Sequence, residues 1–200
     1  IAGTGVTIVK TLGASTNLGS ITTTNLTLQL AGNVTFGGTF NTGPAVTFDT
    51  DNDTTARTVD ISTATNLPAS IAVDDDVTIT LTATQANTLT MTGAGTAIVT
   101  SLAATTNLSS VSVAALTLQL AGDVTYTGSV HGTPAITLDT SSGGTARALD
   151  ITGSGSFNPV SIAVDDDVTL TMTATQANAE TITGAGTVIV TSLAATTNLS

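Results

Sequence analysis

The chain has no cysteine, three basic residues and 2% aromatic residues among its 200 positions. The absence of cysteine excludes disulfides, thiolate metal ligands and cysteine nucleophiles. A nucleic-acid-binding surface needs clustered Lys and Arg, whereas a net charge of −11 repels DNA, RNA and anionic lipid. No apolar run reaches the 18 residues of a membrane span. We therefore expect neither nucleic-acid partners nor membrane insertion.

The small number of charged and aromatic residues also constrains the fold. Charged residues make up 8% of the chain, against about 25% in ordinary soluble proteins. Disorder is nevertheless excluded, because it accompanies low hydrophobicity, and here 40% of residues are hydrophobic. With one Tyr and four Phe, the core must come mainly from Val, Ile, Leu, Ala and Thr methyl groups. This composition favours thin, regular, stacked structures.

The chain is a tandem repeat of about 90 residues. Its most regular segment occurs at 93–109 and 184–200, and in a looser form at 3–18. We divide the chain into repeat 1 (1–90), repeat 2 (91–181) and a partial repeat 3 (182–200). Because the chain starts inside a repeat, we expect it to be part of a longer protein.

Within each repeat, apolar and polar residues alternate. Val77, Ile79 and Leu81, for example, are separated by single threonines, which predicts a half-buried strand with Thr on its outer face. The repeat offset changes from 90 to 91 within the Gly/Ser-rich stretch 152–158. This change predicts a loop, because a one-residue slip inside a strand would turn every later side chain to the other face. We expect a helical turn only at 173–178.

Two all-β architectures fit this pattern. We favour a parallel β-solenoid (β-helix) with about four coils per repeat, since fixed-period self-similarity is typical of solenoids. Stacked Thr and Asn ladders also suit coils about 4.8 Å apart. The alternative is a row of immunoglobulin-like β-sandwiches, each about 100 residues long. Sandwich cores usually contain a large aromatic, and the two repeats share one only at Phe36 and Tyr126.

The run VTITLTATQAN at 77–87, followed by MTGAGT at 91–96, resembles the Thr/Ala/Gly-rich β-strand repeats of giant bacterial surface proteins. These include repetitive adhesins, S-layer-type proteins and extracellular filament or matrix proteins. The resemblance implies a secreted protein at the cell surface or in the extracellular matrix. It also implies a passive role, in which the repeats extend, cover or self-associate.

We therefore expect a structural segment of a stalk, S-layer or filament, and not an enzyme. It would form a homo-oligomer or polymer through repeat stacking or exposed strand edges. One alternative is a calcium-dependent adhesin or binding module. Another is a polysaccharide-active β-helix enzyme, but sugar clefts usually carry aromatic platforms, and Tyr126 is nearly the sole candidate.

Two acidic triplets are the sharpest polar features. If each triplet lay in a strand, alternation would bring Asp74 toward Asp76 while Asp75 pointed away. Carboxylate oxygens suit Ca²⁺, which takes six to eight oxygen ligands. The candidate metal ligands are Asp74, Asp76, Asp165 and Asp167. In the competing interpretation the triplets are solvated turns whose carboxylates accept hydrogen bonds from nearby amides.

A weaker candidate metal site is formed by Asp49, Asp51 and Asp53, whose spacing resembles the start of an EF-hand loop. Thr54 stands where such a loop needs glycine, and the second repeat does not maintain the acids. No cofactor other than a possible Ca²⁺ is expected.

Overall fold

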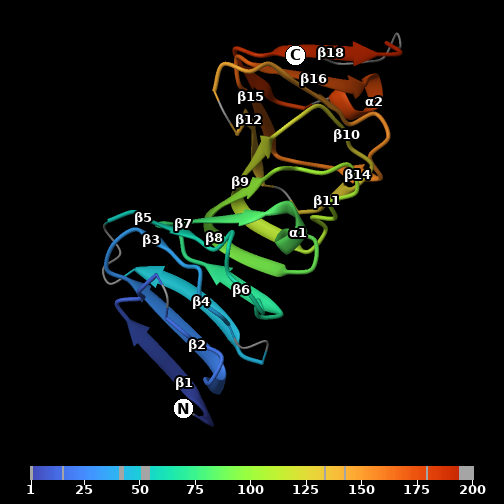
Figure 1. Ribbon diagram of the computed structural model, residues 1–200. Coiled ribbons are helices and arrows are strands. Elements are labelled where there is room, and N and C mark those ends of the chain that lie inside the picture. The colour runs from blue at the N-terminus through green and yellow to red at the C-terminus, as the bar shows by residue number, and fades with distance from the viewer. Residues whose placement is uncertain are drawn as a thin grey trace.

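The computed structural model describes residues 2–14, 16–40, 43–50, 55–132, 134–141, 143–178 and 180–193. They form a β-solenoid of about nine turns, in which short strands stack coil upon coil between the two ends of the chain (Figure 1). Among these residues every pair of neighbouring strands is parallel. Since an immunoglobulin-like sandwich is built from antiparallel sheets, the solenoid prediction is confirmed and the sandwich alternative is wrong.

The elements recur in the same order in both repeats. The first seven strands and the first helix are β1 (Ala2–Lys10), β2 (Thr22–Leu30), β3 (Val34–Thr35), β4 (Ala45–Thr50), β5 (Arg57–Asp60), β6 (Ser70–Val73), β7 (Val77–Thr82) and α1 (Ala83–Ala86). The elements that follow are β8 (Thr90–Thr100), β9 (Val111–Leu120), β10 (Val124–Thr125), β11 (Ser129–Val130), β12 (Ala135–Thr140), β13 (Arg147–Asp150), β14 (Ser156–Phe157), β15 (Ser161–Val164), β16 (Val168–Thr173), α2 (Ala174–Ala177), β17 (Ile182–Gly184) and β18 (Thr187–Thr191).

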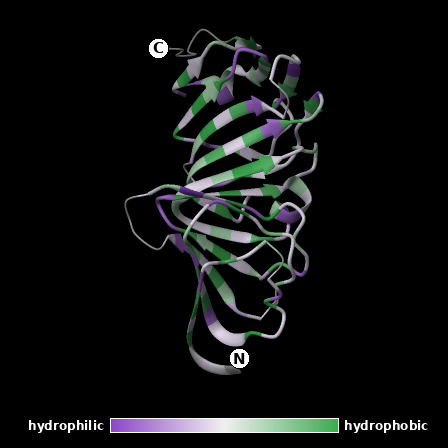
Figure 2. Cartoon of the chain, turned by 60° about the vertical axis from the view of Figure 1, so that its left-hand side comes forward, coloured by the Kyte–Doolittle hydropathy of each residue, from purple (hydrophilic) through white to green (hydrophobic). Residues whose placement is uncertain are grey.

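Most strands form three stacks, which we call sheets 1, 2 and 3, and β11 pairs separately with β14. Sheet 1 contains β1, β2, β4, β6 and the first residues of β8 and β9. Sheet 2 contains β3, β5, β7, the last residues of β8 and β9, and then β12, β15 and β17. Sheet 3 contains β10, β13, β16 and β18. The alternating bands of hydropathy along the strands are visible in Figure 2, and they follow from inward Val, Ile and Leu and outward Thr.

β8 passes from one sheet to the next within its own length. Its Met91 pairs with Ile71 of β6 in sheet 1, whereas its Ala97 pairs with Ile79 of β7 in sheet 2. β9 lies on both parts of β8 in the same way. As a result, equivalent strands of the two repeats lie in neighbouring sheets: β4 in sheet 1 and β12 in sheet 2. The strands of repeat 2 are therefore displaced by one sheet relative to the equivalent strands of repeat 1.

One hydrophobic core runs through both repeats, and it contains every aromatic residue of the chain. The core is mainly aliphatic, as expected, and the aromatic rings pack within it. Phe36 and Phe40 have ring centroids 4.8 Å apart, and the Phe40 and Phe48 centroids are 6.3 Å apart. In the second repeat Tyr126 packs edge-on against Phe157 at 6.3 Å.

The irregular segments lie between the strands and outside sheets 1, 2 and 3. Both α1 and α2 are present, so the expectation of a single helical turn at 173–178 was incomplete. Each begins with a capping box, formed at α1 by Thr82 and Gln85. Gln85 Nε2 also donates to Ile61 O at 2.8 Å in the preceding coil. Within the stretch 152–158, residues 152–155 and 158 lie outside strands as the insertion predicted, but Ser156–Phe157 is the strand β14, which pairs with β11. Neither helix is long and apolar enough to cross a membrane, within the part of the chain that the structure describes.

Candidate cation site

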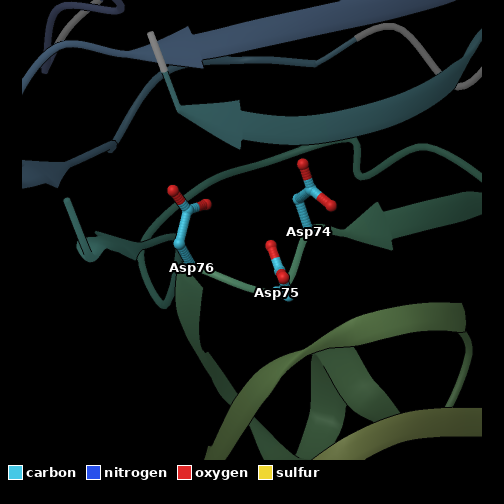
Figure 3. A group of neighbouring side chains, drawn as sticks. All are labelled: Asp74, Asp75 and Asp76. Carbon is cyan, nitrogen blue, oxygen red and sulfur yellow. The ribbon is translucent and has the colours of Figure 1, made fainter. Parts of the chain in front are cut away.

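The acidic triplets are turns between strands, not parts of strands. Asp74–Asp76 connects β6 to β7, and Val77 N donates to Asp74 O at 3.0 Å to close the turn. Strand alternation therefore does not apply, and the prediction that Asp75 points away is wrong. Figure 3 shows all three side chains on the same side of the turn, and one carboxylate oxygen of each lies within 4.8 Å of the others.

In the second repeat, a strand residue joins the triplet. Carboxylate oxygens of Asp139, Asp165 and Asp167 all lie within 4.8 Å of one another. Asp139 belongs to β12, and β12 is paired directly with β15, which precedes the acidic turn. The equivalent residue of the first repeat is Asp49 on β4, whose side chain is hydrogen-bonded with that of Asp74. Both repeats thus bring a strand carboxylate to an acidic turn of the next coil.

The EF-hand-like site at Asp49, Asp51 and Asp53 stays a prediction. Asp51 and Asp53 lie outside the described residues. Asp49, the third member, is on a strand, and its Oδ1 accepts a hydrogen bond from Thr50 N at 2.7 Å. Its side chain also contacts Asp74 in the acidic turn one coil further on.

The electrostatics of the first cluster are unfavourable without a counter-charge. Burial raises the pKa of Asp74 above its usual value, and the neighbouring Asp49 and Asp76 raise it further. A hydrogen bond with the Asp75 backbone acts in the opposite direction. Because the pKa in the folded state exceeds that in the unfolded state, folding stability falls as pH rises through this pKa. A bound cation would reverse this effect by favouring the ionised form.

The last acid of each turn has one buried oxygen without a partner. Asp76 Oδ2 accepts from Thr50 Oγ1 at 2.6 Å, and Asp167 Oδ2 accepts from Thr140 Oγ1 at 2.7 Å. In both residues Oδ1 is buried and has no hydrogen-bond partner. Buried polar atoms are normally paired, and an unpaired carboxylate oxygen is especially costly. A hard cation such as Ca²⁺, held by the clustered carboxylates and completed by water or backbone carbonyls, would satisfy these oxygens.

A shallow depression of about 390 Å³ adjoins the second cluster on the outer face of sheet 2. Its floor is formed by the outward residues Ile98, Thr117 and Thr137, and Asp139 and Asp165 also line it. Tyr126, the residue that the sequence offered as a sugar platform, is fully buried. Since the four Phe are buried as well, no aromatic ring is available on any face for stacking against a sugar.

The sequence located the four turn acids, but it did not reveal the contribution of Asp49 and Asp139. The available signal was their distance along the chain: each precedes the first acid of its triplet by about one coil, as the pairing of Phe48 with Val73 and of Leu138 with Val164 shows. Comparisons with protein-family models, with curated proteins and with solved structures gave no match. The candidate site therefore stands on geometry alone.

Proposed function

We propose that this chain is a structural segment of a secreted cell-surface or extracellular matrix protein, which extends as a rod by stacking repeat upon repeat. The observation that carries the proposal is the junction at β8. There repeat 2 is joined to repeat 1 by the same parallel backbone pairing and the same continuous core that join coils within a repeat. Such a junction can be repeated indefinitely, which is the property that a stalk or filament needs.

The end coils support the same proposal. Leu102 is 4% exposed because β9 and its turn cover it, whereas its equivalent in the last coil, Leu193, is 64% exposed. Ile189 of β18 and Ile8 of β1 are likewise exposed. Unpaired strand edges recruit further strands, so these faces favour stacking with a further coil of the repeat. The Thr-rich outer faces of the sheets complete a surface suited to a passive scaffold.

The rod model predicts a fixed increment of length per repeat. Chains containing two, three and four complete repeats should lengthen by about 19 Å per added repeat, because four coils spaced about 4.8 Å apart are added each time. Small-angle scattering measures the maximum dimension directly. An increment of about 40 Å, or a dimension that grows as the square root of the repeat number, would contradict a rigid solenoid rod.

A second candidate function is cation-dependent stiffening or adhesion through the acidic clusters. The unpaired buried Oδ1 atoms of Asp76 and Asp167, present in both repeats, favour it. A cation bound there would bridge a turn to the preceding coil through Asp49 or Asp139. Binding would then stabilise the stack without altering the strands.

Calcium should raise the unfolding temperature if the clusters bind it. At about 100 times the Kd, binding contributes about 2.7 kcal/mol, or about 5–10 °C for a chain of this size. The double variant Asp76→Asn/Asp167→Asn should lose this shift, because the amide cannot replace the ionised ligand. Thermal melts followed by circular dichroism, with calcium and with EDTA, measure the effect.

Asp123→Asn is the matched control. It removes one acid, but the first repeat already has Asn33 at the equivalent place, where its Oδ1 accepts from Thr58 N. Asp123 Oδ1 accepts the equivalent bond from Ala148 N. This variant should retain the full calcium shift. An unchanged melting midpoint in the parent chain would remove the cation hypothesis.

A further inference from the structure

No contact within their own coil requires the two residues Gly3 and Gly5 of β1 to be glycine. A methyl group added at Gly3 or Gly5 would meet no atom within 4 Å. Their equivalents in β8 are tightly enclosed: a Cβ at Gly93 would lie 2.0 Å from Val73 O, and one at Gly95 would lie 2.2 Å from Asp74 O. The enclosing atoms belong to the coil before β8.

The last coil repeats this contact. A Cβ at Gly184 would lie 2.1 Å from Val164 O, and one at Gly186 would lie 2.2 Å from Asp165 O. Gly186 N also donates to Val164 O at 3.0 Å. Wherever the Gly-x-Gly segment has a coil before it, that coil presents an acidic turn, and the turn's carbonyls occupy the space of the missing side chains. Glycine is thus required at these positions by the backbone of the preceding coil and not by the strand that contains it.

The first coil has the same Gly-x-Gly segment without the turn, and Gly3 lacks the positive φ of Gly93 and Gly184. Within the described residues β1 pairs only with β2, so its other edge is open. Val6 and Ile8 are 64% and 54% exposed on this coil, whereas their equivalents Thr96 and Ile98 are half-buried. An open edge and two unfilled glycine positions thus lie together on β1, and the outer face beside this edge carries the exposed Val6 and Ile8.

We propose that this face, Gly3 to Lys10, is a docking surface for the acidic-turn coil of a second copy of the repeat, the coil spanning 161–178. The inference rests on the proposed stacking function and specifies its partner. We choose a coil of this type because its acidic turn places backbone carbonyls where the glycines lack side chains. An unrelated strand edge would not place carbonyls at these positions. The pairing of β17 with β15 and of β18 with β16 gives the register. Val164 of the second copy lies opposite Gly3, and Thr171 lies opposite Ile8.

The same pairing excludes simple end-to-end association of identical 200-residue chains. The first and last coils are of the same type, since β1 and β17–β18 are copies of the β8 segment. A last coil therefore presents a Gly-x-Gly strand to the first coil of another chain and offers it no acidic turn. Docking therefore requires a repeat whose acidic-turn coil is not covered by a following coil, or a repeat that is joined in frame before the first coil.

The test joins a copy of 91–181 directly before Ile1 of the complete chain, which places an acidic-turn coil next to β1. Hydrogen exchange of the amides from Val6 to Lys10 should slow at least tenfold relative to the 200-residue chain. Gly5→Ala should leave exchange and melting of the 200-residue chain unchanged, because its methyl group meets open space. In the extended chain the same substitution should abolish most of the added protection.

Gly122→Ala is the control, because a methyl group there also meets no atom within 4 Å and the residue follows β9, which pairs with β8 and β12 and not with β1. It should have no effect in either chain. Equal behaviour of Gly5→Ala in both chains, or unprotected β1 amides in the extended chain, overturns the docking proposal. The rod proposal is judged separately by length: an extended chain about 19 Å longer with unprotected β1 amides would support the rod and overturn this docking surface.

Discussion

Replacing Tyr126 with alanine is expected to lower the free energy of unfolding by about 4 kcal/mol, the largest effect of any single substitution that we predict. The ring is fully buried and packs edge-on against Phe157 with 6.3 Å between centroids. Its hydroxyl donates to Thr106 O at 2.7 Å and lies 3.2 Å from Ser129 O. Alanine would leave both a cavity and an unpaired carbonyl in the interior of the coil.

Tyr126→Phe separates these two contributions. The first repeat has Phe36 at the equivalent place, so the phenyl ring is sterically compatible with this corner. Loss of the hydroxyl alone should cost about 1 kcal/mol. Burial raises the pKa of Tyr126, so the hydroxyl remains a proton donor throughout the accessible pH range. Urea denaturation followed by far-ultraviolet circular dichroism measures both variants, and equal losses would show that the cavity is unimportant.

Gly95→Ala is expected to destabilise the chain by about 3 kcal/mol, near the upper end for overpacking. The added methyl carbon would lie 2.2 Å from Asp74 O and 2.6 Å from Val77 O. Both are backbone atoms of a paired turn, so neither can rotate away as a side-chain end could. Relief requires separation of β8 from the coil before it, which weakens the junction between the repeats.

Gly122→Ala is the matched control for this substitution. A methyl group at Gly122 meets no atom within 4 Å, so we expect a change within about 0.5 kcal/mol. The two variants differ in the environment of the added carbon and not in its size. If both had the same effect in urea denaturation, the close approach at β8 would carry no energetic weight.

Several features followed from local sequence. Alternation in Val77–Thr82 and Val168–Thr173 identified β7 and β16, since period-two patterns suit strands with one buried face. The change of repeat offset predicted a loop at 152–158, and residues 152–155 and 158 do lie outside strands. The turn acids were also evident, because consecutive aspartates interrupt an apolar pattern. Each of these conclusions depends on neighbours in the chain.

Other features of the site and of the coil contacts depended on which coils are adjacent in the stack. Asp139 joins Asp165 only because β12 and β15 are adjacent strands. The glycines of β8 owe their necessity to carbonyls about twenty residues away.

The sequence by itself determined a tandem, all-β chain of thin coils, because composition, alternation and repeat period are all local properties. Only the tertiary structure decided that β8 crosses from sheet 1 to sheet 2 and that equivalent strands lie in neighbouring sheets. The physical reason is that register between coils is set by close backbone contact and by side chains packed in the interior. Neither can be read from a strand before its neighbours are known.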